Sequence, residues 1–258
     1  MMTENNITGA RPNQDVFSET LQSLAEKDRD IIAVTSDSRG SGKLVPFGRR
    51  FPEQIVEVGI AEQNLVGIAA GLASAGKTVF AVSPACFLTA RSLEQIKNDV
   101  AYSGHPVTLV GISAGLSYGP LGSTHHSLHD LAVLRAIHNL TVTVPADNFE
   151  TEEAVRQAAA AGHPVYLRFG KKPMPLLEAA GKGSFTLGKG RMVREGGDIA
   201  LVACGETVYP ALMAALKLER EHRIRAAVLS MHTVKPLDQE LLAKLAGSAG
   251  AVLTVEEH

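Results

Sequence analysis

Short runs of apolar, often β-branched residues recur along the first two thirds of the chain, separated by longer stretches with a single apolar stripe. The short runs suit strands that are buried on both faces, and they lie at residues 31–35, 54–58, 78–82, 107–112, 140–144 and 165–169. The longer stretches have the period of helices, at residues 15–27, 62–75, 87–103, 128–138 and 151–161. This alternation predicts an α/β fold, a mostly parallel sheet with helices on both faces.

The alternation breaks after Gly170, where residues 171–189 are rich in proline and glycine and resemble a linker. A second series follows, with strands expected at 199–203, 226–230 and 251–255 and helices at 208–221 and 238–246. We therefore expect two domains of the same α/β type, at residues 15–175 and 190–258. The second lacks the helix expected after its last strand, so we interpret it as incomplete.

Composition narrows the class of protein. The 258 residues are 45% hydrophobic and 20% charged, which excludes a disordered chain. A net charge of −2 gives no overall basic field for nucleic acid or for an anionic membrane, and no apolar run is long enough to span a bilayer. Cys86 and Cys204 form no C-x-x-C pair and lie among apolar or small residues, which favours a reduced, cytoplasmic protein.

The expected helix at 62–75 has no charge beyond its first turn and contains Gly67 and Gly71. Glycine costs about 1 kcal/mol per helical position relative to alanine, so two of them suggest close backbone packing. A helix that is apolar all round is buried. We favour burial at a subunit interface over burial in the core of one chain.

Three places could hold chemistry, and each has a simpler interpretation. Glu62 opens the apolar helix, where it either meets a specific partner or only complements the helix dipole. The glycine-rich loop 111–128 contains His125 and His126 and is either functional or a solvated turn. Arg168 ends a strand before Gly170, which suits a bound phosphate or a surface ion pair. The histidine spacing fits no HExxH zinc site, so we expect no metal ligands on this chain. The sequence also contains no P-loop and no G-x-G-x-x-G motif, so we expect no ATP or dinucleotide site.

Five ordered blocks carry a resemblance to a known family. They read FPEQIVEVGIAEQNLVGIAAGLASAGKTVFAV, SLEQIKNDVAYSGHPV, GSTHHSLHDLAVLRAI, TVTVPADNFE and VYLRFG. Together they resemble transketolase, and more closely the C-terminal subunit of a split transketolase. The resemblance covers residues 15–258 and implies a pyrimidine-binding domain followed by the family's C-terminal domain.

The resemblance also implies a thiamine diphosphate site. Glu62 matches the glutamate that hydrogen-bonds the aminopyrimidine ring and holds it in its imino form, which lets the cofactor form the carbanion that transfers a two-carbon ketol unit. Ile60 lies beside it, and Phe87 falls in the helix that packs against the ring. His125 matches a catalytic histidine facing the substrate, and Arg168 the arginine that holds the sugar phosphate.

Parts of the family's site are absent. The diphosphate and its Mg²⁺ need a Gly-Asp-Gly motif with a later Asn, which this chain lacks. The resemblance therefore implies an N-terminal partner subunit that carries them, a site between the two subunit types and an α2β2 heterotetramer. Asp37 falls in a family segment after the first strand, with a role left open.

Three positions depart from the family pattern. Leu121 stands where an aspartate commonly recognises the hydroxyl next to the acceptor aldehyde, Ser113 replaces a histidine, and Leu93 an aromatic residue. Leucine cannot replace a charged hydrogen-bond acceptor in rejecting wrong substrates. We therefore expect a non-standard ketose or acceptor, with apulose phosphate and sulfo-sugars as candidates. Other thiamine diphosphate enzymes, namely 1-deoxyxylulose-5-phosphate synthase and the 2-oxoacid dehydrogenase β subunit, remain alternatives, as does a non-catalytic regulatory subunit.

Overall fold

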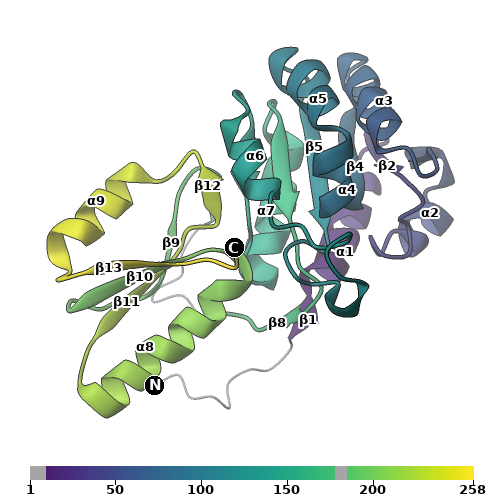
Figure 1. Ribbon diagram of the computed structural model, residues 1–258. Coiled ribbons are helices and arrows are strands. Elements are labelled where there is room, and N and C mark those ends of the chain that lie inside the picture. The colour runs from purple at the N-terminus through teal and green to yellow at the C-terminus, as the bar shows by residue number, and fades with distance from the viewer. Residues whose placement is uncertain (1–9, 178–184) are drawn as a thin grey trace.

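A computed structural model describes residues 10–177 and 185–258 of the chain, which form two lobes built around separate sheets (Figure 1). The expected linker, residues 171–189, therefore lies partly outside the described residues. Its described beginning forms a two-residue antiparallel ladder, in which β8 (Pro173–Met174) pairs with β1 (Arg11–Pro12).

The larger sheet has seven strands in the order β12-β6-β7-β5-β4-β2-β3. Six of them come from the first domain and run parallel, at the runs of apolar residues that predicted them. Their bounds are β2 (Ile31–Thr35), β3 (Ile55–Glu57), β4 (Thr78–Pro84), β5 (Val107–Ile112), β6 (Thr141–Thr143) and β7 (Val165–Arg168). The parallel direction brings all their carboxyl ends to one edge, where ligands bind in open α/β sheets.

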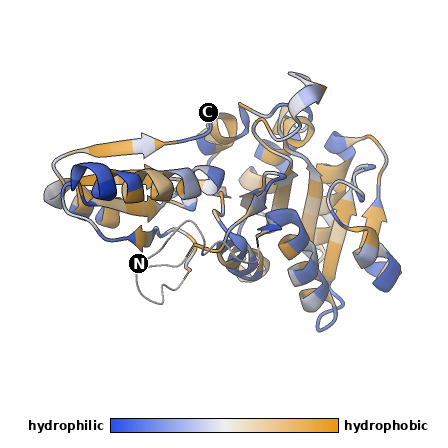
Figure 2. Cartoon of the chain, turned by 90° about the horizontal axis from the view of Figure 1, so that it is seen from below, coloured by the Kyte–Doolittle hydropathy of each residue, from blue (hydrophilic) through white to orange (hydrophobic). Residues whose placement is uncertain are grey.

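Helices cover both faces of this sheet. One face packs against α1 (Asn13–Ala25), α2 (Val45–Arg50) and α7 (Asn148–Ala160), the other against α3 (Glu62–Ser74), α4 (Ala85–Arg91) and α6 (Asp130–Ala136). Figure 2 shows the resulting contrast, with hydrophobic strands inside and polar residues on the outer helical surfaces. A short 3₁₀ turn, η2 (Pro52–Gln54), leads into β3.

The helix expected at 87–103 is broken. It forms α4, a short α5 (Leu93–Gln95) and a π-helical segment, η3 (Ile96–Tyr102). The buried Ser92 hydroxyl donates back to the Leu88 carbonyl, a bond that competes with the helical ladder and bends helices. Helix α4 ends at Arg91, directly before Ser92.

The smaller sheet has the order β13-β10-β11-β9. Strands β10 (Ile199–Ala203), β11 (Ala226–Ser230) and β13 (Val252–Val255) are parallel as expected, whereas the unpredicted β9 (Arg191–Arg194) joins antiparallel to β11. The two faces are covered by α8 (Val208–His222), which a 3₁₀ turn η5 (Gly205–Thr207) precedes, and by α9 (Gln239–Ser248). The expectation of two α/β sheets with helices on both faces is confirmed.

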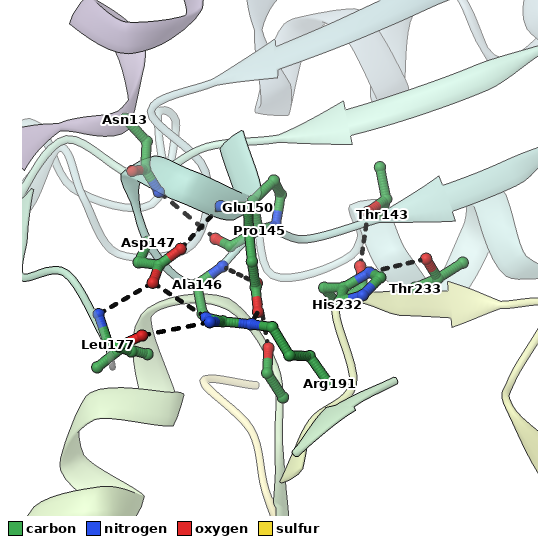
Figure 3. Close-up of polar contacts among 11 residues, drawn as sticks. Asn13, Thr143, Pro145, Ala146, Asp147, Glu150, Leu177, Arg191, His232 and Thr233 are labelled. Atoms are coloured by element: carbon green, nitrogen blue, oxygen red, sulfur yellow. Dashed lines mark hydrogen bonds and ion pairs between the residues drawn. The ribbon is translucent and has the colours of Figure 1, made fainter. Parts of the chain in front are cut away.

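The two domains are joined by a shared strand and by buried charges. Strand β12 (Thr233–Lys235) leaves the second domain and pairs antiparallel with β6 of the first sheet. Arg191 on β9 donates to Glu150 Oε1 at 2.7 Å and to Asp147 Oδ2 at 3.0 Å (Figure 3). All three side chains are buried, so the junction contains a buried cluster of one guanidinium and two carboxylates.

Candidate active site

The carboxyl-end edge of the larger sheet gathers most of the residues singled out in the sequence. Asp37 follows β2, Glu62 follows β3, Phe87 follows β4 and His125 lies in the loop after β5. Asp37 is exposed and lies in the left-handed region with φ of 49°. Its backbone N–H donates to Glu57 Oε1 at the end of β3, and its side chain forms no hydrogen bond or ion pair with the described residues.

Glu62 is buried at the start of α3. The chain leaves β3 through Gly59, whose φ of 73° is a conformation that glycine adopts without strain. This turn brings Glu62 to the first position of the helix with only 4% of the residue exposed. Next to it opens a pocket of about 500 Å³ lined by Ile60, Ala61, Glu62, Gln63, Asn64 and Arg91. Ile60 is 74% exposed, an apolar side chain at the surface beside a buried acid.

Phe87 and His125 lie together, as the shared edge predicts. Their rings meet edge to face with centroids 5.2 Å apart, and the Tyr118 ring also meets His125 edge to face, with the same centroid distance of 5.2 Å. His125 Nδ1 lies 3.0 Å from the Thr124 hydroxyl, which fixes the ring orientation. Burial raises the pKa of Tyr118, so its hydroxyl stays protonated and able to donate a hydrogen bond.

Arg168 belongs to a separate, closed cluster. Only 4% of it is exposed, and its Nε donates to Asp130 Oδ2 at 3.0 Å while Nη2 donates to Glu257 Oε2 at 2.9 Å. Burial by itself would lower the pKa of Arg168, but the neighbouring carboxylates raise it above its ordinary value, so the charge is permanent. The space that Gly170 was expected to leave for a ligand holds the Glu206 side chain instead. In this arrangement Arg168 joins the two domains.

The three departures from the family pattern lie in different surroundings. Ser113 is fully buried with φ of 54°, and its hydroxyl lies 3.2 Å from the Gln14 amide. Leu121 is half exposed on a 3₁₀ turn, η4 (Gly119–Leu121), in the same loop as His125. Leu93 packs against the core on the α3 side of the sheet. Of the three, Leu121 is the most exposed.

Three further features of the described part of the chain concern metal ligands, membrane spans and thiols. No three or more of the His, Cys, Asp and Glu side chains described there are grouped so that they could hold a metal ion. None of the helices in residues 10–177 and 185–258 has the length and apolar character needed to cross a membrane. Cys86 and Cys204 are both free and buried, and burial raises the pKa of each thiol, that of Cys204 to about 11.

Comparison with known proteins decides the family. Residues 11–175 match the model of the transketolase pyrimidine-binding domain, and residues 188–258 match that of the transketolase C-terminal domain. The chain belongs to the transketolase family.

Similar proteins refine this assignment. The chain is 47% identical to one of the subunits of the apulose-4-phosphate transketolase of Phocaeicola vulgatus, over 98% of this chain and 80% of the relative. A solved split-gene transketolase, described as an inactive β4 tetramer, superimposes with a TM-score of 0.87 at 37% identity, over 97% of this chain and 81% of that one. The resemblance to a split transketolase subunit is thereby confirmed. The 1-deoxy-D-xylulose-5-phosphate synthase of Oleidesulfovibrio alaskensis is 39% identical over 95% of this chain, which covers only 38% of the synthase.

Sequence reasoning missed several residues that contact the candidate site residues. Arg91 contacts Glu62, and Asp130 and Glu257 surround Arg168. Arg91 follows Phe87 by one helical turn, a spacing that places the two side chains on one face and could have indicated the contact. Glu257 lies 89 residues from Arg168 along the chain, and no local pattern predicts that pair.

Proposed function

We propose that this protein is the pyrimidine-domain subunit of a heteromeric transketolase, whose thiamine diphosphate site is completed by an N-terminal partner subunit. The observation that carries the proposal is the buried Glu62 carboxylate beside an open pocket, at the edge where the family binds its cofactor. A buried carboxylate needs a polar partner, and a ring nitrogen of an aminopyrimidine fits that need. The family membership implies dependence on thiamine diphosphate.

The residues of this chain fit the pyrimidine half of the cofactor. Glu62 would hydrogen-bond the ring nitrogen, Phe87 would pack against the ring, and the exposed Ile60 would provide an apolar contact beside it. When bound, thiamine diphosphate supplies the electron sink that lets the bond next to a ketose carbonyl break. His125, fixed between Phe87 and Tyr118, would hold and move a proton at a substrate oxygen.

The open face of α3 supports the need for a partner. A Cβ added at Gly67 or Gly71 would meet nothing within 4 Å among the described residues, so this chain itself does not require glycine there. In Figure 1, α3 lies at the outer edge of the first domain, away from the second. We propose that this face packs against the partner subunit, which carries the diphosphate and Mg²⁺ ligands, in an α2β2 assembly. The inactive β4 form of the similar split-gene protein agrees with such dependence.

For the substrate we propose apulose 4-phosphate. The chain is 47% identical to a subunit of an apulose-4-phosphate transketolase, and the half-exposed Leu121 offers no hydrogen-bond acceptor to the hydroxyl that an aspartate would recognise. For Arg168 to hold the sugar phosphate, as we propose, the hydrogen bond from its Nη2 to Glu257 Oε2 has to break.

Reconstitution with the N-terminal partner tests the proposal. We expect thiamine diphosphate with Mg²⁺ to bind the assembled pair in calorimetry, and two-carbon transfer from apulose 4-phosphate to exceed transfer from ordinary pentulose phosphates or a sulfo-sugar.

A variant of Glu62 tests the role of this residue. Glu62→Gln should abolish two-carbon transfer and leave assembly intact, whereas Glu94→Gln, at an exposed position, should change neither the transfer rate nor assembly. Activity surviving in Glu62→Gln would exclude Glu62 as the activating group. A requirement for pyruvate would favour the synthase reaction, and absence of any cofactor binding would favour a non-catalytic subunit.

A further inference from the structure

The buried Glu62 already has a partner within this chain. Arg91 Nη1 donates to Glu62 Oε1 at 3.0 Å and to Oε2 at 2.9 Å. The same guanidinium lies over the Phe87 ring, its central carbon 4.3 Å from the ring centroid. One planar cation thus makes both contacts that the proposed function assigns to the aminopyrimidine ring.

The geometry of the pair determines what else can reach Glu62. A single nitrogen lies almost equally far from both carboxylate oxygens, in the position from which a single ring nitrogen would also approach. The guanidinium covers one face of Phe87, where a flat ring would stack. Arg91 and the ring therefore exclude each other.

Arg91 can leave at small cost, whereas Glu62 cannot do without a partner. The Arg91 side chain is 47% exposed at the end of α4, and Glu62 is its only hydrogen-bonding partner among the described residues. Glu62 is buried, with no other side-chain partner in that part of the chain, and an unpaired buried carboxylate is costly. An arginine free to swing into solvent or toward the partner subunit can keep the acid paired until a ligand replaces it.

We propose that Arg91 is a positioning residue that holds Glu62 and covers Phe87 in the cofactor-free subunit and is displaced by the aminopyrimidine. This inference rests on the proposed function. Cofactor binding is then an exchange of partners at Glu62, and the free energy needed to break the Arg91–Glu62 pair weakens cofactor binding by the same amount.

Calorimetry on the assembled pair of subunits tests the exchange. Arg91→Met removes the charge and keeps much of the apolar stem, so thiamine diphosphate with Mg²⁺ should bind about fivefold more tightly than to the unaltered protein, the factor that corresponds to a partly exposed pair worth about 1 kcal/mol. Arg156→Met is the matched control, because the Arg156 side chain is comparably exposed and also pairs with a glutamate, the exposed Glu152 on α7, outside the site. It should leave the affinity unchanged.

Unchanged or weaker binding in Arg91→Met would overturn the inference, because Arg91 would then stay beside Glu62 in the loaded site. If the unaltered assembly itself binds no cofactor, the proposed function fails, and the displacement of Arg91 by the cofactor fails with it. If the unaltered assembly binds the cofactor tightly and Arg91→Met binds it no more tightly, only the displacement of Arg91 is refuted and the proposed function stands.

A double-mutant cycle gives a second readout that does not depend on activity. Arg91→Gln, Glu62→Gln and the double variant are compared in thermal unfolding, first as this chain alone and then as the assembly saturated with cofactor. We expect the two positions to be coupled in the chain alone and uncoupled in the loaded assembly. Coupling that persists after loading would contradict displacement of Arg91.

Discussion

Arg168 and His125 lie near the same edge of the sheet, Arg168 among charged side chains and His125 among uncharged ones. Arg168 is enclosed by Asp130 and Glu257, whereas His125 is held by aromatic rings and a hydroxyl. Although burial alone would raise it, the pKa of Glu257 is lowered by the Leu116 N–H and by Arg168, so Glu257 is ionised at neutral pH. It then competes with any phosphate for Arg168.

Removing this competition gives a prediction for a single residue. Glu257→Gln should lower KM for phosphorylated donors several-fold and leave KM for an unphosphorylated donor unchanged, because Arg168 loses one carboxylate and gains capacity for a phosphate. Steady-state kinetics of the assembly with both donor types measures the difference. If Glu257→Gln leaves KM unchanged for both donor types and only lowers the melting temperature, Arg168 is a structural link between the domains and does not bind phosphate.

Among the elements, α3 is a helix whose position was predicted correctly but whose burial was predicted only in part. Its lack of charge suggested burial all round, yet the helix packs on one side only, and Gly67 and Gly71 face away from the described core. The glycines are therefore not explained by contacts within this chain. A surface that is poor in side chains suits close approach of another backbone, as the proposed partner would provide.

Filling that surface is a test at the level of the element. Gly67→Leu should leave the folded chain as stable as before or slightly more so, because glycine in a helix costs about 1 kcal/mol and nothing lies within 4 Å of the new Cβ. The same change should prevent assembly with the N-terminal subunit, measured by size-exclusion chromatography with light scattering. Gly111→Ala is the contrast, because its Cβ would overlap the Tyr166 hydroxyl and should destabilise the chain itself. Normal assembly of Gly67→Leu would exclude this face from the interface.

The predicted strands matched the structure closely because long-range burial leaves a local signature, a run of apolar β-branched residues. The helix break after Arg91 was not predicted, because the apolar pattern of residues 87–103 continues through it. The site followed the same division. The parallel strands bring Phe87 and His125 together at one edge of the sheet. The partners of Arg168 lie 38 and 89 positions away along the chain, and the second of them, Glu257, depends on how the two domains dock.

At the scale of the whole molecule, the junction between the domains contains buried polar groups whose charge states are set by folding. His232 is fully buried and stacked on Phe185, with ring centroids 4.1 Å apart. Its Nδ1 lies 3.1 Å from the Thr233 hydroxyl (Figure 3). Burial, assisted by the nearby Arg191, lowers the pKa of His232 to about 3, although Asp147 and Asp238 act in the opposite direction. The folded protein therefore keeps this histidine neutral.

This shift makes the stability of the domain junction depend on pH. Below about pH 6.5 the unfolded chain binds a proton at His232 and the folded chain does not, so the free energy of unfolding falls by up to about 1.4 kcal/mol per pH unit until the pH nears 3. His232→Phe keeps a ring beside Phe185 and removes the titration. Between pH 7 and pH 5, where most carboxylates remain ionised, denaturant unfolding should show a steeper loss of stability for the unaltered protein than for this variant. Equal slopes would mean that His232 becomes protonated without unfolding, and that the junction admits water at this position.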